Sequence, residues 1–125
     1  MTARSAIVRY SPDAEYGEWI NVAVLAWDGV TPMRGRILGD WRRAVAFGAP
    51  PNGEVIDTVA AMIREGPYGL PKHRAWPHGR YVVSDAWCSA KSVAALLADR
   101  AERALVGPSV PIGPDGLEHE DAHEE

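Results

Sequence analysis

Three observations predict an α+β fold in which two main helices pack on an antiparallel sheet. Short segments with the alternating or wholly apolar pattern of strands follow one another between residues 6 and 38. Two longer segments, 52–65 and 89–106, carry apolar residues at the spacing of amphipathic helices. One more strand-like segment lies between them, so the expected order is three strands, a helical turn, a helix, a strand and a helix.

The first three strands are predicted at 6–10, 19–27 and 33–38, as a meander. Segment 19–27 is apolar on both faces, with Asn21 as the polar exception, and should be a central strand. Turn residues lie at 12–17 and at 28–29, between these strands. Segment 33–38 alternates arginine with small or apolar residues, which is typical of a half-exposed edge strand able to mediate dimerisation.

Capping residues bound the predicted helices. A short helical turn at 40–48 would have Asp40 as its N-cap and Gly48 as its stop. The next helix ends at Glu65, before Gly66-Pro67, and the last is capped by Ser89 or Ser92 and runs to Val106.

Segment 66–79 is rich in Pro and Gly and is expected to be a long irregular connection before a strand at 81–83, which could continue to Trp87. One α+β domain is therefore expected over residues 1–107. Residues 108–125 combine Pro, Gly and acidic residues with few apolar ones, so an acidic disordered tail is expected there.

The charge of the chain favours neither nucleic acid nor a membrane as a partner. The net charge is −4, but six of the 17 acidic residues lie at or after Asp115, and the first 114 residues carry about +2. A single cysteine, Cys88, suits a reducing compartment, and the N-terminus lacks the apolar core of a signal peptide. We therefore expect a cytoplasmic protein, with Cys88 buried.

One polar cluster, at the first hairpin, carries two interpretations. It comprises Arg9, Asp13, Glu18 and Asn21, and simple hairpin closure places Arg9 opposite Glu18. In the structural interpretation Arg9 and Glu18 fix the register, Asp13 caps the turn and Asn21 bonds to neighbouring backbone. In the functional interpretation the same groups face a ligand, as in a small enzyme or a ligand-binding protein.

This hairpin also carries a resemblance. The pattern Arg9-Tyr10-x-Pro12-Asp13, then Gly17-Glu18 and Asn21-Val22-x-Val24, followed by Asp40 to Ala44, resembles the family known as domain of unknown function family 3037. The resemblance spans residues 5 to 107, the late strand and last helix fitting loosely. It implies a small bacterial cytoplasmic protein without established activity. It also implies a genetic setting similar to that of partners of HipA-type toxin kinases, and so an accessory or regulatory role.

Exposed aromatic and basic residues suggest a partner-binding surface. Trp76 and Tyr68 lie in the Pro/Gly-rich segment, and Trp41 is followed by Arg42 and Arg43. Trp and Arg are enriched in interface hot spots, so we favour a non-enzymatic interaction or regulatory module. Nucleic-acid binding through the arginines is the weaker alternative, because the body of the chain is close to neutral.

No motif in the sequence names a reaction, a metal site or a cofactor. The four histidines include His119 and His123 at helical spacing in the acidic segment, where a solvated tail is the simpler interpretation. We therefore expect no metal and no cofactor.

Overall fold

The computed structural model is α+β, as predicted, with a larger sheet than the sequence suggests. It describes residues 2–11, 19–49, 52–67, 73–76, 79–84, 87–89 and 91–118, of which 73–76, 79–80 and 87 are described by backbone alone. Three helices and one eight-stranded sheet are formed by these residues. All strand pairs described are antiparallel.

The strands and helices follow one another in an order close to the predicted one. The strands are β1 (Ala3–Ser11), β2 (Ile20–Trp27), β3 (Arg34–Leu38), β4 (His73–Trp76), β5 (Gly79–Val83), β6 (Trp87–Ser89), β7 (Ser109–Gly113) and β8 (Gly116–Leu117). The helices are α1 (Arg42–Phe47), α2 (Asn52–Glu65) and α3 (Val93–Ala104). Across the sheet the strand order is β4-β5-β1-β2-β3-β7-β8, and β6 pairs with the first part of β1.

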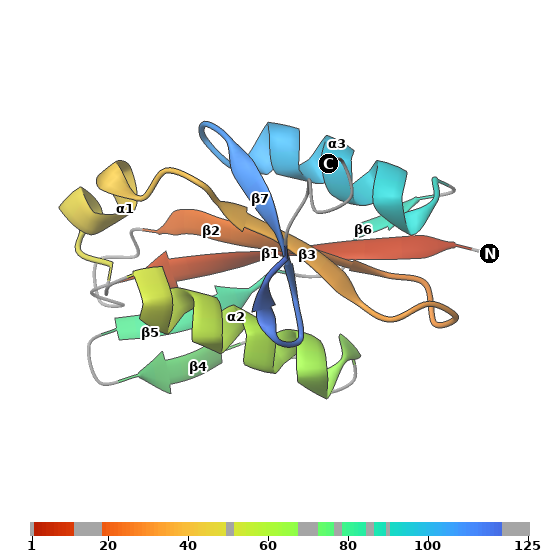
Figure 1. The fold of residues 1–125 in the computed structure, drawn as a ribbon, viewed down its shortest axis with the longest axis horizontal. Helices are drawn as coiled ribbons and strands as arrows, with labels where there is room; N and C mark the ends of the chain where they lie inside the picture. The colour runs from red at the N-terminus through yellow and green to blue at the C-terminus, as the bar shows by residue number, and fades with distance from the viewer. Residues whose placement is uncertain are drawn as a thin grey trace.

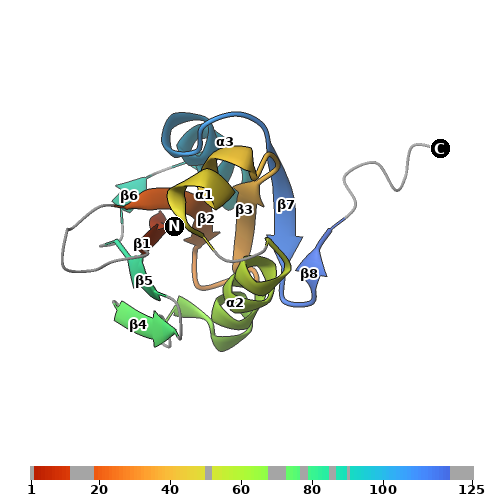
Figure 2. The same ribbon diagram turned by 90° about the vertical axis from the view of Figure 1, so that its left-hand side faces the viewer.

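The two long helices cover opposite faces of the central strands (Figures 1 and 2). Helix α3 lies against β1, β2 and β3, whereas α2 packs on β3, β7 and β8. Each helix buries one stripe, including Val59 and Met62 in α2 and Leu96 and Leu97 in α3. The central strand β2 lies between them, so its residues 22–26 are buried whichever face they point to, as its two-sided apolar pattern predicts.

The prediction that residues 108–125 form a disordered tail is wrong for residues 109–117. Strand β7 pairs with β3 over four residues and continues through a turn into β8. Its Ile112 is 1% exposed and belongs to the main core. Strand β7 pairs with the edge of β3 that faces away from β2. The expectation that 33–38 is an exposed edge strand is therefore also wrong.

The predicted long connection at 66–79 contains a strand, because β4 pairs with β5 from His73↔Val82 to Trp76↔Gly79. Cys88 is exposed rather than buried. It lies on β6, a three-residue strand that pairs with β1.

The helix ends follow the predicted caps with two changes. Helix α1 has Trp41 rather than Asp40 at its N-cap, and the Asp40 carboxylate instead accepts a hydrogen bond from the backbone N–H of Arg42. Gly48 ends α1 at a φ of 108°, which favours glycine. Ser92 caps α3 by accepting a bond from the Ala95 N–H, and the helix ends at Ala104, two residues before the predicted end.

Candidate functional site

A pocket of about 290 Å³ lies where β2 begins, β3 ends, α1 begins and α3 ends. These four ends meet on the left in Figure 1, around α1. Apolar side chains of Trp19, Ile20, Leu38, Ala104 and Val106 line it, together with the polar side chains of Asn21, Asp40 and Arg43. We call it the hairpin-end pocket, because Trp19 and Ile20 lead into β2 from the first hairpin.

Asn21 lines the hairpin-end pocket, next to a bulge that interrupts the pairing of β1 and β2. Val8 pairs with Ala23 and Arg9 with Asn21, so Val22 is an extra residue in β2. A bulge of this kind changes which face the following side chains occupy, and Asn21 reaches α3. Its Nδ2 donates to the carbonyl oxygen of Ala104 at 2.9 Å.

Arg9 is the second polar residue that the structure joins to Asn21. Its Nε donates to Oδ1 of Asn21 at 3.2 Å, and both side chains are half-buried. The predicted pairing of Arg9 with Glu18 is wrong, because the bulge and the longer connection bring Asn21 opposite Arg9. The Asn21 amide links the end of α3 to the sheet, and the same residue lines the pocket, so both interpretations of Asn21 stay predictions.

The charged side of the hairpin-end pocket is formed at the start of α1. Both oxygens of Asp40 accept bonds from the Arg42 guanidinium, Oδ1 from Nε at 3.0 Å and Oδ2 from Nη2 at 2.7 Å. These bonds, with the one from the Arg42 N–H, lower the pKa of Asp40 to about 2. At neutral pH the Asp40 carboxylate is therefore ionised and already hydrogen-bonded to Arg42, which makes it a poor general base.

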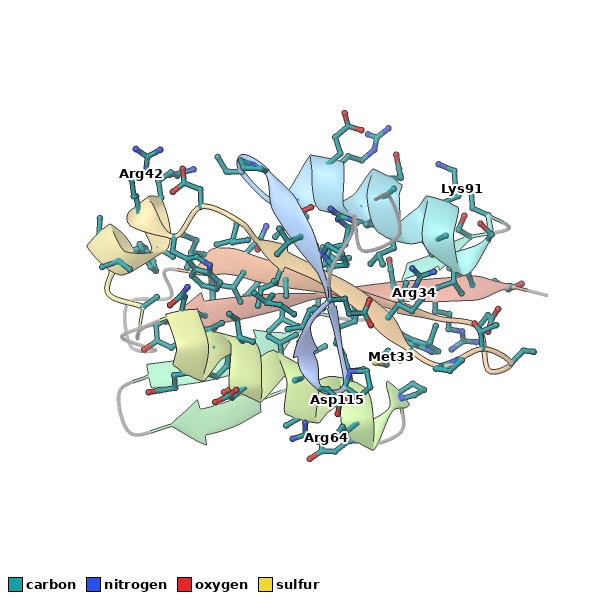
Figure 3. The ribbon with its side chains drawn as sticks, viewed as in Figure 1. Met33, Arg34, Arg42, Arg64, Lys91 and Asp115 are labelled. Carbon is teal, nitrogen blue, oxygen red and sulfur yellow. The ribbon has the colours of Figure 1, made fainter. Side chains whose placement is uncertain are left out.

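Arg43 is the cation at the pocket. It is exposed, and within the described part of the chain it forms no ion pair. Arg42 points outward instead, with its side chain 90% exposed, and Figure 3 shows it at the upper left, on α1. Trp41 is half-buried against the core, so the predicted aromatic and basic cluster divides into a packing residue, an outward ion pair and one arginine at the pocket.

The rim of the hairpin-end pocket is apolar and open to solvent. Trp19 is 40% exposed and Val106 is 62% exposed, which places them among the five exposed large hydrophobic residues of the described part of the chain. Sequence reasoning did not select either residue for the site. Trp19 and Val106 lie together because α3 ends beside β2. The hydrogen bond from Asn21 to Ala104, two residues 83 positions apart in the sequence, holds the helix end there.

The remaining predicted site residues are not tested by the geometry. Asp13, Glu18 and Tyr68 lie outside the described residues, and Trp76 is described only by its backbone in β4. Their roles stay predictions.

A second polar region, beneath α2, belongs to the core. The rings of Tyr10 and Tyr81 meet edge to face, with centroids 5.1 Å apart. Burial is the main cause that raises the pKa of each phenol, and each is about 1% exposed. The two buried tyrosine rings therefore contribute to the packing between the sheet and α2 and are not accessible to a ligand.

Neither a metal centre nor a membrane-spanning helix emerges from the described residues. Searched over those residues, no group of three His, Cys, Asp or Glu side chains could hold a metal ion. His119 and His123 lie outside them. The described helices are also too short or too polar to cross a membrane.

Comparison with known proteins gives no relative. No protein-family model, curated protein or solved structure matches the chain. The resemblance to domain of unknown function family 3037 therefore stays a prediction.

Proposed function

We propose that this protein is a non-enzymatic interaction module that binds a protein partner at the hairpin-end pocket. The observation that carries the proposal is the exposed apolar rim of Trp19 and Val106 around a pocket that also holds Arg43. Tryptophan and arginine at a concave site are the residues that contribute most to binding energy in protein interfaces. Among the described residues that line the pocket, Asp40 has a lowered pKa and Asn21 is used structurally, so none of them is an evident general acid or base.

The resemblance to domain of unknown function family 3037 supports a more specific version of the proposal. It makes the chain an accessory or regulatory protein of the bacterial cytoplasm, and a kinase of the HipA type is the partner class to examine first. Tyr68 and the side chain of Trp76, which lie outside the part of the chain that the structure describes, remain candidate contacts for this partner.

Affinity capture from the source cells tests the proposal with a matched pair of variants. Val106→Ala removes an exposed valine from the pocket rim, and Val30→Ala removes a similarly exposed one, 68% against 62%, from the turn after β2. We expect Trp19→Ala to reduce the amount of captured partner about tenfold or more and Val106→Ala to reduce it less. Val30→Ala should leave it unchanged.

Circular dichroism and thermal unfolding of each variant show that the fold persists. Equal capture of the same partner by wild type and Trp19→Ala would contradict the proposal.

A small-molecule site is the second candidate, favoured by the convergence of Asn21, Asp40 and Arg43 on one pocket. Its volume of about 290 Å³ is at the lower limit for small-ligand pockets, roughly 300 Å³. This candidate predicts that a screen of small carboxylates raises the melting temperature of the wild type and not of Arg43→Ala. If no carboxylate in the screen raises the melting temperature of the wild type, the small-molecule site is excluded.

A further inference from the structure

The charge distribution at the hairpin-end pocket identifies the chemistry of its occupant. We propose that the pocket receives one apolar side chain of a protein partner, with a carboxylate of the adjacent acidic residue on Arg43. This inference rests on the proposed function and specifies what the partner must present.

The apolar part follows from the walls and size of the pocket. Trp19, Ile20, Leu38 and Val106 come from three separate segments and enclose a space small for a drug-sized ligand. Such a space takes a single anchor side chain better than an extended apolar segment. Burying the exposed area of Trp19 and Val106 beneath that side chain would favour binding.

The requirement for a carboxylate follows from the charges. Among the described residues, two charged side chains, Asp40 and Arg43, line the pocket, and Asp40 already receives two guanidinium bonds from Arg42. Its charge is therefore compensated locally, whereas Arg43 forms no ion pair within the described residues. A guanidinium beside apolar walls favours a carboxylate, which it can bind through two parallel hydrogen bonds.

The opposite end of the molecule provides a contrast. A second pocket, of about 410 Å³, is lined there by Arg34 with two carboxylates, Asp28 and Glu118. Arg34 lies on β3 far from α1, as its label and that of Arg42 show in Figure 3. Arg34→Glu thus makes the same charge change as Arg43→Glu in a different setting.

Three synthetic peptides test the inference on the full chain by two-dimensional ¹⁵N NMR. Capped Ser-Gly-Leu-Glu-Ser-Gly presents the proposed pair, Ser-Gly-Leu-Lys-Ser-Gly reverses the charge, and Ser-Gly-Ala-Glu-Ser-Gly removes the anchor. We expect the Leu-Glu peptide to shift the Trp19 indole and the Val106 amide signals, with a millimolar dissociation constant. Each of the other two peptides should bind at least about fivefold more weakly.

The variants then separate this inference from the proposed function. Arg43→Glu should reverse the preference between the Leu-Glu and Leu-Lys peptides, and Arg34→Glu should leave it unchanged. Equal shifts with both peptides, or no shifts with any of them, would overturn the inference.

Affinity capture of the partner from cells by the same variants provides the second test. If its capture depends on Trp19 but is unaffected by Arg43→Glu, the proposed contact between a partner carboxylate and Arg43 is refuted and the interaction module stands. If the captured protein is a second copy of this chain, the inference of a distinct acidic partner is overturned. Loss of capture with Arg43→Glu, and not with Arg34→Glu, supports the inference together with the peptide result.

Discussion

Asn21 shows how one side chain can be polar, half-buried and still structural. Its Oδ1 accepts from Arg9 and its Nδ2 donates to Ala104, so the amide links β1, β2 and the last residue of α3. A buried polar group without partners would cost free energy, and here both ends of the amide are satisfied. The same bonds place the C-terminal end of α3 beside Trp19 and so define the pocket.

Asn21→Ala is therefore expected to lower the free energy of unfolding by about 1–3 kcal/mol, because it leaves the Ala104 carbonyl and Arg9 without this partner. Urea unfolding followed by circular dichroism measures the change. A loss below about 0.5 kcal/mol, accompanied by loss of ligand or partner binding, would instead favour a direct binding role for Asn21.

The carboxylate of Asp40 gives a pH-dependent prediction. Its folded pKa of about 2 is below its ordinary value of 3.8, so its contribution to stability is present above 3.8 and is lost as pH falls through about 2. Arg42→Ala should raise the pKa of Asp40 toward 3.8, which NMR titration of the Asp40 carboxyl signal measures. An unchanged midpoint in Arg42→Ala would show that the guanidinium is not the main cause.

At the scale of elements, strand β3 has close neighbours on three sides. It pairs with β2 and β7, and Gly35 faces Leu25, Ile63 of α2 and Ile112 of β7. A Cβ at position 35 would lie 2.9 Å from Leu25 Cδ2 and 3.0 Å from Ile112 Cγ2. The glycine therefore allows Ile63 of α2, and Leu25 and Ile112 of the neighbouring strands, to approach β3 closely.

Gly35→Ala is expected to destabilise the protein by about 1–3 kcal/mol, because those side chains must shift to admit the methyl group. Gly53→Ala is the control, since a Cβ there meets nothing within 4 Å in the first turn of α2. It should leave stability unchanged or raise it by up to about 1 kcal/mol. Equal effects of the two substitutions, measured by thermal unfolding, would refute this packing.

At the scale of the whole molecule, local patterns predict the elements and miss the long-range pairings. Strands β1 to β3 and helices α2 and α3 have clear periodicity and caps, and they form where expected. Strand β7 was not expected, because its short alternating run contains Pro111, which lacks an N–H, and is followed by Gly, Pro and acidic residues. Its partner, β3, lies more than 70 residues earlier in the chain.

The hairpin-end pocket was beyond sequence prediction for a similar reason. It joins residues 19–21, 38–43 and 104–107, which only the antiparallel order and the early end of α3 bring together. Asn21 and Arg43 were selected from the sequence, whereas Trp19 and Val106 acquire their role only from that arrangement. The bulge at Val22 adds a change of face that simple strand alternation does not predict.

The most direct test of the account is site-specific photo-crosslinking in the source cells. A benzoyl-phenylalanine replaces Val106 at the pocket rim in one strain and Val30, the exposed control, in another. If the hairpin-end pocket is the interaction site, position 106 gives one abundant adduct with a distinct protein and position 30 gives none. Adducts formed equally from both positions, or from neither, would contradict the claim that the hairpin-end pocket is the interaction site.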